Sequence, residues 1–286
     1  MKSGDSMYIS PMLLQTALEP FNSDQYLFEP KSNGVRLLLH SKSNEITVFT
    51  RHGTNLTGRL PEIESLSLPD FYLDGELVCY KEGQEDFESV MSRINAASPR
   101  TIQKGFHDNP LIYIVFDILQ SQGNWIVKLP LMERKKILSA VLPESTHLKQ
   151  TIVSADYGNE LFNQVKLLEM EGIVAKKKNS FYEIGQRSKS WLKIINWRYY
   201  ICFITGFKKE QTGWLLNMDG QNVGVVEFGM NPVHKEAFYR ISKGIITSEN
   251  ERYVYIEPYI RCKVKGRGIL RSGLIMTPVF VEFIVG

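Results

Sequence analysis

Hydrophobic positions along the first two thirds of the chain follow two different periods. Runs rich in β-branched and aromatic residues predict a strand–turn–strand unit over 27–40 and further strands over 46–49, 71–80 and 112–119. Apolar residues at helical spacing predict helices over 87–97, 132–141 and 158–170. Because strands and helices do not alternate regularly, the pattern indicates an α+β fold in place of a βαβ repeat.

The last third has a pattern of its own. Strands are predicted over 199–207, 214–218, 223–228 and 253–265, with Gly or Asp-Gly at several turns. Between the last two lies a predicted helix over 231–243, where Asn231 suits the cap and Pro232 the first helical position. This order is typical of a small five-stranded barrel of the OB type, and we place a domain boundary near Asn196.

Composition and charge exclude several classes of protein. With 286 residues, 43% hydrophobic and 23% charged, the chain suits one large or two ordinary soluble domains. Three cysteines, far apart, predict no disulfide framework, and the five histidines do not cluster as a zinc site would. The longest apolar run, 111–119, falls well short of the ~20 residues that cross a bilayer. The start, 1–5, lacks the apolar core of a signal peptide, so we expect a cytoplasmic location and no membrane partner.

The segment 29–36, Glu-Pro-Lys-Ser-Asn-Gly-Val-Arg, carries a candidate nucleophile. Free lysine has a pKa near ~10.4, so its neutral amine is scarce at pH 7 unless the surroundings favour it. Gly34 lets the backbone turn tightly after Lys31. On its own the segment is a weak signal, and a surface turn that carries a lysine is the plainer interpretation, since Asn-Gly is a common turn sequence.

Further motifs follow in order, and together they resemble the ATP-dependent DNA ligases, most of all the short ligase module of bacterial end-joining enzymes and their phage relatives. The motifs are Thr50–Gly53, Leu73–Val78, Val115–Ile118, Glu171–Lys176 and Gly185–Lys193. The resemblance covers residues 8 to 280. It implies a nucleotidyltransferase domain of ATP-grasp-like architecture with antiparallel sheets over 1–196, followed by an OB-fold domain over 197–286.

The resemblance also implies a reaction in three steps that uses ATP and Mg²⁺ or Mn²⁺. Lys31 matches the nucleophile that takes AMP from ATP. The AMP then passes to a DNA 5′-phosphate, and a 3′-hydroxyl finally displaces it and seals the nick. The expected partner is therefore nicked double-stranded DNA, bound by a monomer that serves repair, end joining, recombination or phage replication.

The other matched residues divide by the part of the substrate that they would contact. Lys193 matches the phosphate-binding lysine, with Lys176 as a second candidate, and Glu171 and Glu76 match metal-binding carboxylates, Glu76 also lying beside the ribose. Arg36 and Arg51 match arginines near the ribose and the DNA 5′-phosphate. Phe116 matches the ring that stacks on adenine, Glu29 matches a residue that lines the adenine pocket, and Arg187 could contact nucleotide or DNA. Each has a plainer alternative. A strand Phe is usually core, a Lys-Lys-Lys run can be a solvated turn, and acidic strand residues can form surface ion pairs.

A separate pattern indicates DNA contact in the second domain. Arg261, Lys263, Lys265 and Arg267 alternate with apolar residues, in a window from 258 to 281 without any acidic residue. On a strand, such alternation puts the cations on one face, where they can follow a phosphate backbone. The alternative is an edge strand protected by lysine against aggregation.

The chain also departs from the family pattern at three places. Asn33 stands where the family usually has Asp, and Ile195 where many members have a second phosphate-contacting Lys. After Thr277–Phe280 the usual closing Arg-x-Asp-Lys signature is absent from 281–286. We therefore expect a slow first step, since one preorganised donor is worth on the order of 10²–10³ in rate. Two alternatives remain: a degenerate ligase-like protein that binds nucleotide or nicks without turnover, and an RNA-end ligase.

Overall fold

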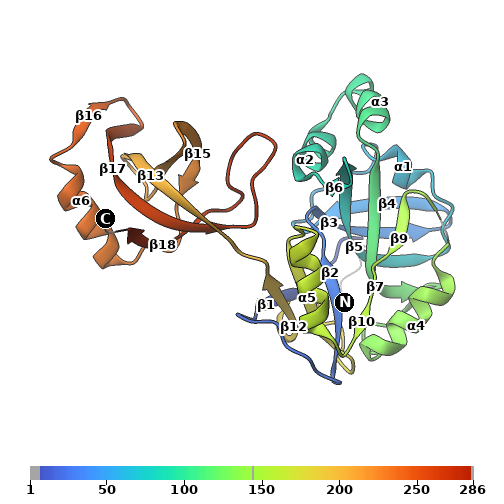
Figure 1. The fold of residues 1–286 in the computed structure, drawn as a ribbon. Helices are drawn as coiled ribbons and strands as arrows, with labels where there is room; N and C mark the ends of the chain where they lie inside the picture. The colour runs from blue at the N-terminus through green and yellow to red at the C-terminus, as the bar shows by residue number, and fades with distance from the viewer. Residues whose placement is uncertain (1–6, 144, 285–286) are drawn as a thin grey trace, which may run out of the picture. The chain divides into compact units, whose positions relative to one another are not determined.

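The computed structural model describes residues 7–143 and 145–284, in two compact units that meet in sequence between Asn196 and Trp197 (Figure 1). The amino-terminal stretch 1–5, on which the signal-peptide prediction depends, lies outside these residues. In the described part of the chain, no helix is long and apolar enough to cross a membrane.

The first unit contains two mostly antiparallel sheets, which confirms the mixed α+β class. One has five strands in the order β1-β12-β11-β2-β10. Their bounds are β1 Leu13–Thr16, β2 Tyr26–Lys31, β10 Ser154–Ala155, β11 Gly172–Lys177 and β12 Arg187–Ile195. We call this sheet the nucleophile sheet, because Lys31 ends β2.

The second sheet of this unit has the order β4-β3-β5-β7-β8, with β6 beside β5 and β9 beside β7. The bounds are β3 Val35–Lys42, β4 Glu45–Thr50, β5 Phe71–Lys81, β6 Gln84–Glu85, β7 Leu111–Ser121, β8 Asn124–Trp125 and β9 Leu148–Gln150. We call it the second sheet. Its long strands β3, β5 and β7 agree with the runs predicted from hydrophobic pattern.

Five helices are described in the first unit: α1 Pro61–Glu64, α2 Phe87–Asn95, α3 Pro99–Asp108, α4 Leu131–Val141 and α5 Gly158–Leu167. The pattern predicted α2, α4 and α5 to within three residues at each end. It missed α3, in which no side chain is fully buried. The start of α3 could nonetheless have been predicted from the sequence, because Ser98 and Thr101 form a capping box and Pro99 takes the first helical position.

Three hydrophobic layers hold the first unit together. The outer face of the second sheet packs with α2 and α4, through residues such as Leu73, Val90 and Leu138. On the nucleophile sheet, α5 covers the outer face through Leu161 and Val165. The middle layer joins the two sheets, and its members are Met12, Leu27, Leu38, Phe49, Tyr72, Leu119, Leu131, Tyr182 and Trp191. The two inner sheet faces therefore look toward each other, and the polar residues on these faces converge.

The second unit is a separate sheet with the order β15-β14-β13-β17-β16 and β18 beside β17. The bounds are β13 Arg198–Lys208, β14 Trp214–Met218, β15 Gln221–Val226, α6 Pro232–Ser242, β16 Ile246–Glu249, β17 Tyr253–Gly266 and β18 Val279–Ile284. As predicted, Asn231 caps α6: its side chain accepts a hydrogen bond from the His234 N–H at 2.8 Å. All three cysteines of the chain are buried free thiols.

Candidate active site

Strand register places the candidate residues of the nucleophile sheet in successive rows. Residues opposite one another across β2, β11 and β12 point to the same face, as do alternate residues along a strand. The rows are Lys31–Gly172–Ile195, then Glu29–Val174–Lys193, then Leu27–Lys176–Trp191. All of these side chains consequently share the face that packs toward the second sheet.

Lys31 is held by a carboxylate at one end of this face. Its Nζ lies 2.8 Å from Oε2 of Glu171, whose side chain is only 3% exposed. Glu171 immediately precedes β11, and the next residue is glycine for a steric reason. Gly172 has φ +153°, and a Cβ there would lie 2.2 Å from the Ile194 carbonyl oxygen. The close approach of β11 to β12 therefore brings Glu171 to the lysine.

The turn after Lys31 rests directly on the second sheet. A Cβ on Gly34 would lie 2.1 Å from the Leu77 carbonyl oxygen, so only glycine fits this contact. From the sequence, we explained Gly34 by the conformational freedom that a tight turn after Lys31 needs. The structure assigns it instead to close packing of the turn on β5, without a positive φ.

On the second sheet, Arg36 and Glu76 lie opposite each other, and Asp74 lies opposite Leu38 on the same face. Arg36 binds Asp74 through two parallel hydrogen bonds, Nε–Oδ1 at 2.9 Å and Nη2–Oδ2 at 2.6 Å. Asp74 also accepts a bond from the Tyr182 hydroxyl at 2.6 Å. Such a bidentate pair fixes the guanidinium plane, so Arg36 is oriented before any ligand binds.

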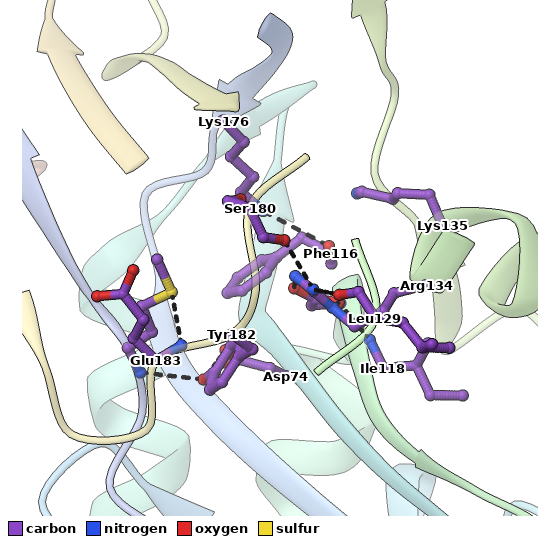
Figure 2. Close-up of polar contacts among 12 residues, drawn as sticks. Asp74, Phe116, Ile118, Leu129, Arg134, Lys135, Lys176, Ser180, Tyr182 and Glu183 are labelled. Atoms are coloured by element: carbon purple, nitrogen blue, oxygen red, sulfur yellow. Dashed lines mark hydrogen bonds and ion pairs between the residues drawn. The ribbon is translucent and has the colours of Figure 1, made fainter. Parts of the chain in front are cut away.

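A β-bulge directs Phe116 toward the inner face. Between β5 and β7, Gly75 is opposite Val115 and Asp74 is opposite Asp117, which makes Phe116 the extra residue. Bulges re-aim side chains in this way. Phe116 is half-buried against the middle layer, and the Arg36 guanidinium lies 5.3 Å from its ring centre. Arg134 secures the bulge from behind with two 2.8 Å bonds to the buried Asp117 (Figure 2).

Glu76 links the two sheets electrostatically. Burial raises the pKa of Glu76 to about 7, while Lys31 and Arg36 lower it and Glu171 and Asp74 raise it further. These groups therefore lie within electrostatic reach of one another. The carboxylates of Glu76 and Glu171 are acceptors near a lysine, a donor set that suits a hard divalent cation.

Glu29 and Lys176 form a buried ion pair beside Phe116. Lys176 Nζ lies 2.7 Å from Glu29 Oε2, and Lys135 on α4 contacts the other carboxylate oxygen. The Lys176 ammonium also lies 4.3 Å and 4.1 Å from the ring centres of Phe116 and Trp191. Figure 2 shows Lys176 reaching toward Phe116, with Lys135 extended from α4. Burial lowers the pKa of Lys176 to about 8, so the solvated-turn alternative is wrong for this lysine.

Along the strand direction, the row of Lys193 lies nearer to the row of Lys31 than the row of Lys176 does. The row of Lys193 is two residues along the strand from the row of Lys31, whereas the row of Lys176 is four residues away. At ~3.3 Å per residue these separations are roughly 7 Å and 13 Å. These are separations along the strand direction only, and they place Lys176 far from Lys31 and beside the ring of Phe116.

Arg51 and Arg187 are both exposed at the rim of this face. Burial lowers the pKa of Arg51, and so do Arg36 and Arg187, which are close enough to repel it. The Arg187 guanidinium donates to the Leu14 carbonyl. Arg51 therefore lies within electrostatic reach of Arg36, Arg187 and Glu76.

Two residues near the site were not predicted from sequence. Lys135 comes from α4, where nothing distinguishes it from other helix lysines. Glu85 comes from the two-residue strand β6 and accepts a 2.7 Å bond from the Asn33 N–H. Neither lies in a motif, so only the fold brings them to the site.

In the second unit, β17 carries three of the predicted cations, Arg261, Lys263 and Lys265, on one face, and we call this row the stripe. Arg261, Lys263 and Lys265 point away from the core, while Cys262 and Val264 are buried. Arg267 is different from the prediction, because β17 ends at Gly266 and Arg267 lies beyond it. The edge-strand alternative is wrong, since β17 pairs with β13 on one side and with β16 and β18 on the other.

A row of exposed apolar side chains, two of them aromatic, runs beside these cations on the neighbouring strand. Tyr199, Ile201 and Phe203 on β13 lie opposite the three cations and are 56%, 42% and 38% exposed. Cation–ring contacts tie the two rows together: Arg261 with Phe203, Lys263 with Tyr199 and Lys265 with Trp197, at 5.9, 5.2 and 4.8 Å. Glu282 on β18 partly neutralises Lys263 at 3.4 Å.

The inner sheet faces thus bring together a partly buried lysine paired with a carboxylate, an aromatic ring and an arginine. Comparison with known sequences assigns the family. The pattern of the ATP dependent DNA ligase domain matches residues 10–194. The SPbeta prophage-derived DNA ligase-like protein LigB of Bacillus subtilis (strain 168) is 39% identical over 279 residues, covering 96% of this chain and 98% of LigB. The chain belongs to the ATP-dependent DNA ligase family, whose members are enzymes that join DNA.

Other relatives are longer or more distant. The bifunctional non-homologous end joining protein LigD of the same organism is 32% identical over 278 residues, but these span only 45% of LigD. A solved mycobacterial DNA ligase D, complexed with ATP and MES, is 21% identical with a TM-score of 0.61, covering 96% of this chain and 95% of that one. A Lig E DNA ligase is 14% identical with a TM-score of 0.67, covering 96% and 99%. These two solved structures show the shared fold.

Proposed function

We propose that this chain is an ATP-dependent DNA ligase that works through AMP bound covalently to Lys31. The observation that carries the proposal is the Lys31–Glu171 contact on an inner sheet face that also presents Lys193, with Arg36, Glu76 and Phe116 on the facing sheet. An amine, a phosphate-binding cation and a stackable ring at this spacing suit a nucleoside triphosphate.

The proposed first step is an attack of the Lys31 amine on the α-phosphorus of ATP. A nitrogen–phosphorus bond forms, the bond to the bridging oxygen breaks, pyrophosphate leaves and the amine loses a proton. The roles of the surrounding residues follow from their positions. Lys193 stabilises negative charge on the α-phosphate, Phe116 stacks on the base, and Arg36 and Glu76 lie where the ribose would be.

The donor set near Lys31 fits a divalent cation. Mg²⁺ is commonly held by one or two carboxylates together with substrate phosphates, and Glu171 and Glu76 supply two. Within residues 7–143 and 145–284, no group of three or more His, Cys, Asp or Glu forms a metal site without substrate. Bound there, Mg²⁺ or Mn²⁺ would neutralise phosphate charge.

For the second unit we propose an OB-fold domain that binds DNA. An isolated bridge between Phe228, just after β15, and Val279 of β18 supports closure of the sheet into a barrel. The row of Arg261, Lys263 and Lys265 beside exposed aromatic side chains supports binding to nucleic acid, because cations follow the backbone and rings stack. The predicted monomer, its cytoplasmic location and a role in repair, recombination or phage replication remain predictions.

The covalent adduct tests the function directly. The parent protein, incubated with labelled ATP and Mg²⁺, should gain the mass of AMP on Lys31. Lys31→Ala should form no adduct because it has no amine, and Lys31→Arg should form none because guanidinium stays protonated; both variants should remain folded. Lys177→Ala, an exposed lysine on β11, is the matched control and should label fully. An adduct in Lys31→Ala would refute the assignment.

The departures from the family pattern at Asn33 and Ile195 favour an impaired first step, which the same purified protein can test. Ile195 occupies the row of Lys31 and is buried, so that row contributes no second cation from β12. If the first step is slow for this reason, nicks that already carry 5′-AMP should be sealed much faster than ordinary nicks with ATP. Equal rates would refute an impaired first step. Binding without any sealing would support the non-enzyme alternative, and faster sealing of matched RNA nicks the RNA-end alternative.

A further inference from the structure

The turn that follows Lys31 is held by a carboxylate from another part of the chain. Glu85 Oε2 accepts a hydrogen bond of 2.7 Å from the backbone N–H of Asn33. Glu85 comes from β6, which pairs with the end of β5 through Tyr80. The same turn packs on the Leu77 carbonyl through Gly34. The turn of the candidate nucleophile is therefore fixed on β5 and β6 of the second sheet.

Glu85 also belongs to the charge network around Lys31. Burial raises the pKa of Glu85; the bonds from Asn33 and Ser32 lower it, Glu171 raises it and Lys31 lowers it. Glu85 therefore lies within electrostatic reach of Lys31 at the end of β2 and of Glu171 just before β11. Residue 33 itself contributes no charge here, because its side chain is an amide.

We propose that Glu85 is a positioning residue for Lys31, supplying from β6 the negative charge that residue 33 does not provide in this chain. The inference deepens the proposed function and rests on Lys31 as the nucleophile. A hydrogen bond to an ionised acceptor is roughly twice as strong as a neutral one. A carboxylate at residue 85 therefore holds the Asn33 N–H, and with it the backbone that carries Lys31, more firmly than a neutral acceptor does.

The test separates charge from shape. Glu85→Gln keeps an oxygen that can accept the Asn33 N–H but removes the charge. We expect Lys31–AMP formation to slow about 10-fold in a single turnover, the difference between a charged and a neutral hydrogen bond. The dissociation constant for ATP should change by less than about 3-fold, since Glu85 contacts the turn and not Phe116 or Glu29. Glu82→Gln, on the exposed turn before β6, is the matched control and should react like the parent.

A second substitution makes the proposal falsifiable in both directions. Asn33→Asp places a carboxylate on the same turn, so the double variant Asn33→Asp/Glu85→Gln should recover to within about 3-fold of the parent rate. A parent-like rate in Glu85→Gln would overturn the proposal. So would a slow double variant that melts like the parent, because a carboxylate at residue 33 and one at residue 85 would then not be interchangeable sources of negative charge. A parent that forms no adduct on Lys31 would overturn the proposed function and this inference together.

Discussion

Replacing Glu76 by glutamine should make the first unit more stable and the enzyme less active. Glu76 lies on the inner face of β5, and burial raises its pKa from 4.5 to about 7. The folded state therefore binds this proton more tightly than the unfolded state does. The resulting stability is fully present below pH 4.5 and is lost as the pH rises through 7. Glutamine resembles the protonated acid and does not ionise, so Glu76→Gln keeps that stability at every pH.

The magnitude follows from the change in pKa. At 1.36 kcal/mol per pKa unit, the rise from 4.5 to about 7 corresponds to about 3 kcal/mol at pH 8.5. At pH 5 the difference between variant and parent should shrink to under about 1 kcal/mol. For a unit of this size, about 3 kcal/mol corresponds to roughly 6–12 °C in melting temperature.

Urea unfolding at pH 5 and pH 8.5 provides the measurement, with Glu45→Gln as the control for loss of an exposed charge on the same sheet. The opposite change is expected in function. Loss of this carboxylate should slow Lys31–AMP formation on the order of 10²-fold at pH 8.5. A variant that is no more stable than the parent at pH 8.5, or whose advantage does not depend on pH, would refute the reasoning.

Three further predictions concern the ring, the buried ion pair and the stripe. Phe116→Ala should weaken ATP binding about 10-fold and Phe116→Tyr much less, because stacking needs the ring face; equal affinities by calorimetry would make Phe116 plain core. Asp74→Ala should cost about 3–5 kcal/mol in urea unfolding, since it leaves the Arg36 charge buried without its carboxylate, and a cost below about 1 kcal/mol would contradict this. Neutralising Arg261, Lys263 and Lys265 together should reduce the slope of log affinity for nicked DNA against log salt by roughly two to three; an unchanged slope would remove the stripe from DNA binding.

Local pattern was sufficient for the long strands and for three of the five helices described in the first unit, and for which residues of a single strand share a face. On β17, alternation alone predicted that Cys262 and Val264 are buried beneath the cations, because successive strand residues point to opposite faces. The start of α6 at Asn231 and Pro232 followed equally from capping chemistry. Motif order also identified Lys31, Glu171 and Lys193 as a set, and the register of β2, β11 and β12 places Lys31 and Lys193 on one face with Glu171 at its end.

Contacts between strands distant in sequence could not be predicted in this way. The bulge that turns Phe116 inward depends on the pairing of β5 with β7, and the position of Lys176 beside that ring depends on its distance in register from Lys31. Glu85 reaches Asn33 only because a two-residue strand pairs with the end of β5. Sequence alone determined which residues share a face, because that follows from a period of two or 3.6 residues. Tertiary structure decided which faces meet, because register, bulges and the burial of charge depend on the whole fold.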